Sequence, residues 1–136
     1  MPTTVLVIDD DCDIRNMLHI LLQDEGGYTV METADPASAL DILHTTPHSL
    51  VVLFDYRMPH IDGEALLALA QQEAGLTERH AFVCMTGANR DLLPPTLRML
   101  LALYEVPLVA KPFDIDDMLA VIRQAEQRLA QVPART

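Results

Sequence analysis

The sequence contains four short apolar runs, and each gives way abruptly to polar residues. The runs lie at residues 5–8, 50–55, 81–85 and 107–110, the second of them ending on Asp55. Their nearly continuous apolar character, rich in Val, Leu and Ile, is typical of strands buried on both faces of a parallel sheet. A fifth segment, residues 28–33, mixes Tyr, Val and Glu and predicts a more exposed strand.

Between the predicted strands, apolar residues recur three and four positions apart, as on one face of a helix. Asp13 is the expected N-cap of the first helix and Gly26-Gly27 its stop, while Pro94-Pro95 fits the first turn of the fourth. The predicted helices cover residues 13–25, 36–45, 64–73, 94–104 and 114–131. Five strand–helix pairs in strict alternation predict an α/β domain, a parallel sheet covered by helices on both faces.

Size and composition narrow the class of protein. A chain of 136 residues favours one domain, which we expect to occupy residues 1–136 with a core of about 4–130. The 20 acidic and 9 basic side chains give a net charge of -11, which disfavours nucleic acid as a partner. No apolar run approaches the roughly 18 residues of a membrane span, and Cys12 and Cys84 lack a CxxC spacing. We therefore expect a cytoplasmic protein with reduced thiols and no membrane contact.

Chemically useful side chains follow four of the predicted strands. Asp9 and Asp10 follow the first, Asp55 ends the third, Thr86 follows the fourth and Lys111 follows the fifth. In a parallel sheet these ends meet at one edge, where α/β proteins bind their ligands. Three carboxylates there repel one another unless a cation joins them, and hard oxygen ligands suit Mg²⁺. The sequence therefore predicts a Mg²⁺ site on these carboxylates.

The same set of side chains suits the transfer of a phosphoryl group to a carboxylate. Negative charge spreads over three oxygens of the moving group, so positioning and neutralisation supply most of the catalysis. Mg²⁺, Lys111 and the Thr86 hydroxyl would each take one of these oxygens. Asp55 would then be the nucleophile and would form an acyl phosphate.

Each of these residues alone has a simpler explanation. An Asp at a strand end commonly caps a loop, a Lys-Pro pair commonly marks a turn, and Asp11 and Asp13 fit a helix start. The joint placement of the whole set favours a functional site. The histidines show no metal-binding spacing, and we expect them to be exposed or half-buried: His19, His44, His48, His60 and His80.

From Val5 to about Leu129 the chain resembles the receiver domain of bacterial two-component response regulators. The matching motifs are Asp9-Asp10, Asp55, Met58-Pro59-x-x-Asp62-Gly63, Thr86 and Lys111-Pro112-Phe113. The resemblance implies a flavodoxin-like sheet with strand order 2-1-3-4-5. It also implies that a histidine kinase, a phosphotransfer protein or a small phosphodonor phosphorylates Asp55, and that the chain is a signalling phosphoacceptor rather than an enzyme with a separate substrate.

The resemblance further implies particular roles around Asp55. Mg²⁺ would be held by Asp10, Asp55 and the backbone carbonyl of Arg57, with Asp9 acting through water, and Lys111-Pro112 would be a cis peptide. Arg57 and Ala88 flank the expected entry to the phosphoryl group. We expect these two residues to set the lifetime of the acyl phosphate. Replacing both by other residue types should then change that lifetime.

One position departs from the family pattern. Receivers commonly carry Tyr or Phe three residues before the lysine, where this chain has Leu108. Residues 89–95 are also unusual, and we expect them to carry part of the coupling to the active state.

Receivers usually present their last two helices and last strand to a partner or to a second copy. Here that face would be built on residues 94–104, 107–110 and 114–131, with Met99, Leu103 and Arg123 as contact candidates.

Two alternative functions are a haloacid-dehalogenase-type phosphatase, suggested by Asp9-x-Asp11, and a degenerate receiver that only binds protein. The first leaves Asp55 unexplained, and the complete residue set disfavours the second.

Overall fold

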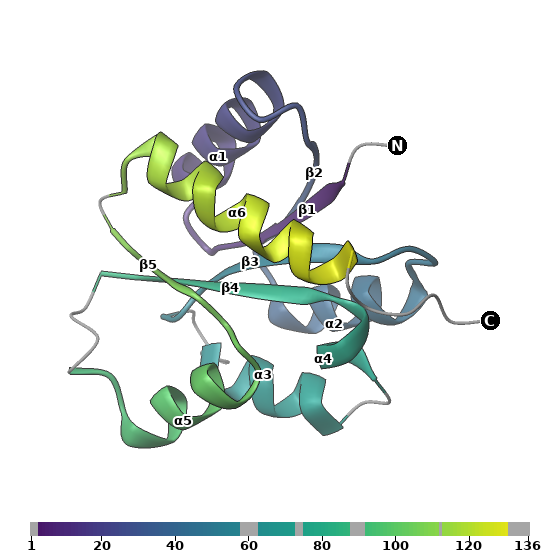
Figure 1. The fold of residues 1–136 in the computed structure, drawn as a ribbon, viewed down its shortest axis with the longest axis vertical. Helices are drawn as coiled ribbons and strands as arrows, with labels where there is room; N and C mark the ends of the chain where they lie inside the picture. The colour runs from purple at the N-terminus through teal and green to yellow at the C-terminus, as the bar shows by residue number, and fades with distance from the viewer. Residues whose placement is uncertain (1–2, 58–62, 73–74, 88–91, 112, 131–136) are drawn as a thin grey trace.

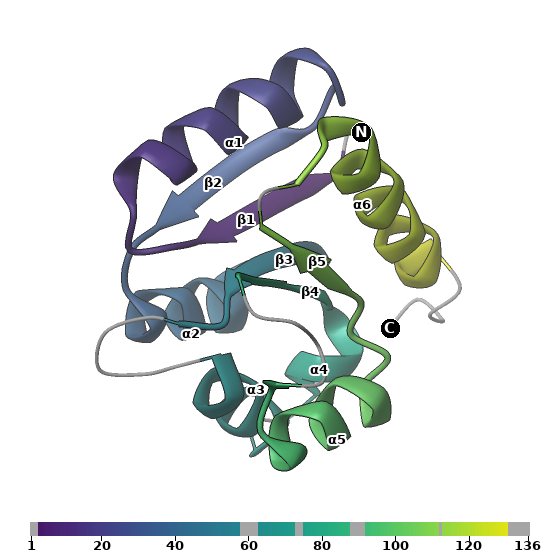
Figure 2. The same ribbon diagram turned by 90° about the vertical axis from the view of Figure 1, so that its left-hand side faces the viewer.

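The sheet has the predicted parallel topology. The computed structural model describes residues 3–57, 63–72, 75–87, 92–111 and 113–130. Its five strands lie in the order β2-β1-β3-β4-β5, and every neighbouring pair is parallel. The strands are β1 (Thr4–Ile8), β2 (Thr29–Thr33), β3 (Leu50–Asp55), β4 (Ala81–Thr86) and β5 (Leu108–Ala110). Figure 2 shows β1 and β2 side by side, pointing the same way.

Helices cover both faces of the sheet, as the alternation of elements predicted (Figure 1). They are α1 (Cys12–Asp24), α2 (Pro36–Thr45), α3 (Gly63–Gln72), α4 (Leu76–Arg79), α5 (Pro95–Leu103) and α6 (Ile115–Ala130). Helices α1 and α6 pack on one face, and α2 to α5 pack on the other. Each face of the sheet therefore has its own hydrophobic core, and successive residues of a strand point into opposite cores. Val5 and Val7 face α1 and α6, while Leu6 and Ile8 face the opposite layer.

The start of α1 corrects one prediction. Asp11, rather than Asp13, is the N-cap, because its carboxylate accepts hydrogen bonds from the backbone N–H groups of Asp13 (2.9 Å) and Ile14 (3.4 Å). The end of α1 agrees with the prediction. Gly27 adopts a φ of 71°, a left-handed conformation that glycine takes without steric cost.

Other differences concern short elements and element ends. The helix α4 was not predicted, because its four residues are too few to show a helical period. Strand β4 extends to Thr86 and β5 begins at Leu108 instead of Pro107. No helix among the described residues is long and apolar enough to cross a membrane.

His80 contradicts the expectation that the histidines are exposed or half-buried, since it is 1% exposed. Its Nδ1 accepts a hydrogen bond from the N–H of Leu50 (2.9 Å), so Nε2 carries the hydrogen and donates to the carbonyl of Leu43 (3.0 Å). The neutral ring thus joins the end of α2 to the start of β3. Burial lowers the pKa of His80 from 6.5 to about 4.

This buried ring predicts a loss of stability in mild acid. In the unfolded chain His80 becomes protonated below about pH 6.5, whereas in the folded chain it becomes protonated only near pH 4. The free energy of unfolding should therefore fall by about 3 kcal/mol over that interval, as urea titrations would measure. We expect His80→Gln to be less stable at neutral pH but to lose less stability on acidification. Exposed His48→Gln should nearly keep the parent's slope, because the charge of His48 is the smallest of the causes that lower the pKa of His80. An unchanged slope in His80→Gln would contradict this assignment.

Candidate functional site

Parallel topology brings the predicted residues to one edge of the sheet. Asp9 follows β1, Asp55 ends β3, Thr86 ends β4 and Lys111 follows β5, so all four lie at carboxyl ends of strands. The backbone N–H of Lys111 donates to the carbonyl of Thr86 (2.7 Å), which continues the ladder beyond β5. The sequence prediction that these strand ends meet is therefore confirmed for Asp9, Asp55 and Lys111, whose side chains are in direct contact.

Three carboxylates converge at this edge. One oxygen from each of Asp9, Asp10 and Asp55 lies within 4.8 Å of the other two. Asp9 is fully buried and Asp55 is 8% exposed, while Asp10 faces solvent. Opposite ligands of octahedral Mg²⁺ are about 4.2 Å apart, because each bond is about 2.1 Å long. The oxygen-only donor set therefore suits Mg²⁺, and the 4.8 Å limit is close enough to this span for small side-chain movements to bring the oxygens to it.

Lys111 supplies the positive charge of the site. Its Nζ lies 3.1 Å from Oδ2 of Asp9 and 3.3 Å from Oδ2 of Asp55, so it bridges the two buried carboxylates. Burial works to lower the pKa of Lys111, but the negative charges of Asp55 and Asp9 outweigh it and raise that pKa. Lys111 is also the only lysine in the sequence. A protonated amine thus lies between the two least accessible acids among the residues whose burial the structure describes.

The electrostatics of Asp55 favour neutralisation by a cation. Burial raises the pKa of Asp55 and the charge of Asp9 adds to the effect, although Lys111 acts in the opposite direction. The backbone N–H of Arg57 also donates a hydrogen bond to this carboxylate. A divalent ion would favour the charged, nucleophilic form of Asp55.

The other residues predicted for the site are Thr86, Leu108, Ala88 and Pro112, and the structure describes the first two. Thr86 lies where the prediction placed it and is 2% exposed. Leu108 is half-buried in β5, opposite Cys84 of β4, and packs against the core formed with α2 to α5. Ala88 and Pro112 lie outside the described residues, as does most of the predicted loop after Arg57, at positions 58–62.

Arg15 is a contributor that the sequence analysis missed. Its Nη1 donates a hydrogen bond to the backbone carbonyl of Asp9 (2.7 Å). A cation is disfavoured near a helix N-terminus, where the backbone N–H groups already carry positive partial charge. A lone Arg in the first turns of a helix that follows three consecutive acidic residues was therefore a usable signal of an acidic or carbonyl partner.

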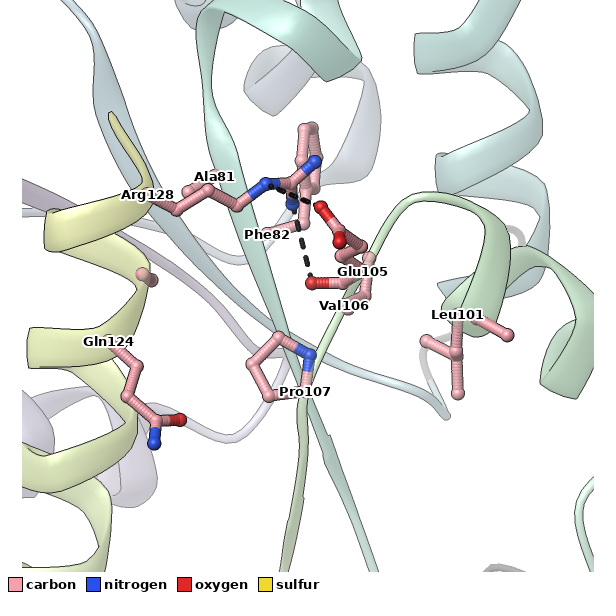
Figure 3. A pocket seen from close by; sticks show the side chains of 10 residues that line it. Ala81, Phe82, Leu101, Glu105, Val106, Pro107, Gln124 and Arg128 are labelled. Carbon is pink, nitrogen blue, oxygen red and sulfur yellow. Dashed lines mark hydrogen bonds and ion pairs between the residues drawn. The ribbon is translucent and has the colours of Figure 1, made fainter. Parts of the chain in front are cut away.

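A cavity of about 320 Å³ lies at the opposite end of the strands, where β4 begins, beside the end of α5 and α6 (Figure 3). Its charged side chains are engaged with each other and with the backbone. Arg128 forms an ion pair with Glu105 (3.4 Å) and donates to the carbonyl of Tyr104 (2.6 Å). Because the cavity lies at the other end of the strands, it is separate from the acidic site.

Comparisons with known proteins agree with this geometry. A family model described as "Response regulator receiver domain" matches residues 5–123. Probable chemotaxis protein CheY of Rhizobium etli is 30% identical over 118 residues, which cover 87% of this chain and 88% of that protein. Sporulation initiation phosphotransferase F of Bacillus subtilis is 29% identical over 124 residues, which cover 91% and 94%. The chain spans only 51% of the length of another relative, response regulator Rre1 of Synechocystis, at 27% identity.

Solved structures show the same architecture. Chemotaxis protein CheY4 of Vibrio cholerae has a TM-score of 0.76 at 21% identity, covering 92% of this chain and 99% of its own. Response regulator StyR has a TM-score of 0.79 at 26% identity, covering 96% of this chain and 62% of its own. Fold, site geometry and family match point to the same assignment, so the chain belongs to the family of response regulator receiver domains.

Proposed function

We propose that this chain accepts a phosphoryl group on Asp55 in a Mg²⁺-dependent reaction and thereby switches an interaction with a partner. One observation above all supports the proposal, namely Lys111 between Asp9 and Asp55 at the edge where the three carboxylates converge. The name of the B. subtilis relative, a phosphotransferase, is consistent with this chemistry. The donor would be a phosphohistidine of a sensor histidine kinase or phosphotransfer protein, or a small acyl phosphate, and such a kinase would place the chain in the cytoplasm.

The transfer needs little covalent chemistry from the protein. An oxygen of Asp55 attacks the phosphorus, the bond from phosphorus to the donor nitrogen or oxygen breaks, and an acyl phosphate forms. Lys111 and the Thr86 hydroxyl would bind oxygens of the moving group. Asp10, Asp55 and the Arg57 carbonyl would hold Mg²⁺, with Asp9 assisting through water, and the ion would neutralise the charge that develops on those oxygens.

The structure disfavours the phosphatase alternative. A phosphatase of that type would use Asp9 as its nucleophile, but Asp9 is fully buried and both its carboxylate oxygens are engaged. Oδ1 accepts from the N–H of Asp11 (2.9 Å) and Oδ2 from Lys111. Asp55 retains some access to solvent, so it is the better nucleophile of the two.

We place the output face on α5, β5 and α6. Met99 and Leu103 are 59% and 65% exposed there, and Arg123 is exposed on α6. These residues would contact a partner or a second copy. If phosphorylation brings two copies together, light scattering should show a larger molecular mass for the phosphorylated chain than for the free chain. Leu108 replaces the aromatic residue common at its position, so residues 89–95 would carry part of the coupling between phosphorylation and the output face. Arg57 and Ala88 would control how fast water removes the phosphoryl group.

Labelling at Asp55 tests the proposal directly. With acetyl phosphate and Mg²⁺, intact-mass analysis should show the addition of one phosphoryl group. Asp55→Asn should abolish the addition because the amide is a poor nucleophile, and EDTA should abolish it in the parent. Asp41→Asn, which changes an exposed acid on α2, is the matched control and should be labelled like the parent. Labelling that persists in Asp55→Asn would refute Asp55 as the acceptor.

Removing Lys111 should expose the repulsion between the carboxylates. In EDTA, Lys111→Met should lower the free energy of unfolding by about 2 kcal/mol, because Asp9 and Asp55 lose their shared cation. Mg²⁺ should restore more stability to this variant than to the parent, since the ion can replace the missing charge. Arg98→Met removes an equal charge from an exposed position on α5 and should change neither quantity. Urea unfolding with and without Mg²⁺ measures both, and equal Mg²⁺ effects in all three proteins would count against this account.

A further inference from the structure

All four polar positions of Asp9 are bonded, which fixes this residue in space. Its N–H donates to the carbonyl of Thr33 (3.2 Å), and its Oδ1 and Oδ2 accept from Asp11 and Lys111. The fourth partner is Arg15, whose Nη1 donates to the Asp9 carbonyl (2.7 Å). Asp9 begins the turn from β1 into α1, so its carbonyl belongs to the peptide unit that leads into Asp10.

Arg15 is itself held in place. Its side chain is 18% exposed, and its Nε lies 3.6 Å from Oε1 of Glu32. The other oxygen of Glu32, Oε2, lies 2.7 Å from Nδ1 of His19. Glu32 sits in β2 opposite Val7 of β1, so a rigid sheet position anchors the guanidinium. The planar guanidinium serves the Asp9 carbonyl and Glu32 at once, which a lysine ammonium does less well.

We propose that Arg15 is a positioning residue for the Mg²⁺ site, acting through the backbone of Asp9 and anchored by Glu32 and His19. The inference rests on the proposed function, because it assigns Arg15 to the same metal centre. Fixing the Asp9 carbonyl orients the next peptide and thus the carboxylate of Asp10, the most exposed of the three acids. Residues that orient metal ligands from outside commonly alter metal affinity about tenfold or more when they are removed.

The sign of the effect separates positioning from simple charge. A guanidinium near a cation site repels the metal, so loss of the Arg15 charge alone would tighten Mg²⁺ binding. Loss of the hydrogen bond to Asp9 would weaken binding, because Asp10 would have to be ordered when the ion arrives. A purely structural role would lower the free energy of unfolding and leave Mg²⁺ affinity unchanged. The three roles therefore predict three different outcomes.

Calorimetric titration of the whole chain with MgCl₂ distinguishes them. We expect Arg15→Gln to weaken Mg²⁺ binding about tenfold. Arg15→Lys should show a smaller loss, because an ammonium keeps the charge and one hydrogen bond. Arg98→Gln, an equal change of charge on exposed α5, should bind Mg²⁺ like the parent. Tighter or unchanged binding in Arg15→Gln overturns the proposal, and if that variant does not fold, unchanged binding in Arg15→Lys overturns it equally.

Labelling with acetyl phosphate supplies the second readout. At saturating Mg²⁺ the labelling rate of Arg15→Gln should return to that of the parent, because Asp55 and Lys111 are untouched, while the Mg²⁺ concentration for half-maximal rate rises. A rate that stays low at saturating Mg²⁺ overturns the positioning role. A parent that binds Mg²⁺ and is labelled, with variants that behave like it, overturns this inference alone. A parent that does neither overturns the proposed function as well.

Discussion

The arrangement of the site depends on the balance between three converging carboxylates and one ammonium. Asp9, Asp10 and Asp55 approach one another closely enough to share a small ion, and without positive charge that approach is unfavourable. Lys111 follows β5, yet it reaches Asp9 after β1, although β3 and β4 lie between those strands in the sheet. One long side chain therefore ties together strands that are not neighbours. The sheet positions the acids, and this single lysine makes their proximity tolerable.

Much of this edge could be predicted from sequence because topology leaves little choice. Continuous apolar runs predict buried parallel strands, and parallel strands place every carboxyl end on the same side of the sheet. Polar residues at those ends must then converge, whatever the details of packing. The prediction worked for Asp9, Asp55 and Lys111 because it needed only the direction of each strand. It did not need the conformation of any side chain.

Features that depend on a particular side-chain conformation could not be predicted in this way. The hydrogen bond of Arg15 to Asp9 depends on how a long side chain folds back over the helix start, which periodicity does not describe. His80 is buried because backbone groups of Leu43 and Leu50, 37 and 30 residues away in sequence, satisfy its two nitrogens. Asp11 and Asp13 are both good N-caps by residue type, and only the backbone geometry chooses Asp11.

The burial of the three acids gives each a different chemical capacity. Asp9 has no exposed surface and four fixed partners, so it can shape the site but cannot readily approach a donor. Asp10 is exposed and can therefore exchange water for an ion at low cost. Asp55 lies between these extremes, exposed enough to be attacked or to attack, yet buried enough for its pKa to respond to a neighbouring cation. A gradient of burial across one sheet edge thus gives three residues of the same type different access to solvent, which suits each to the role proposed for it.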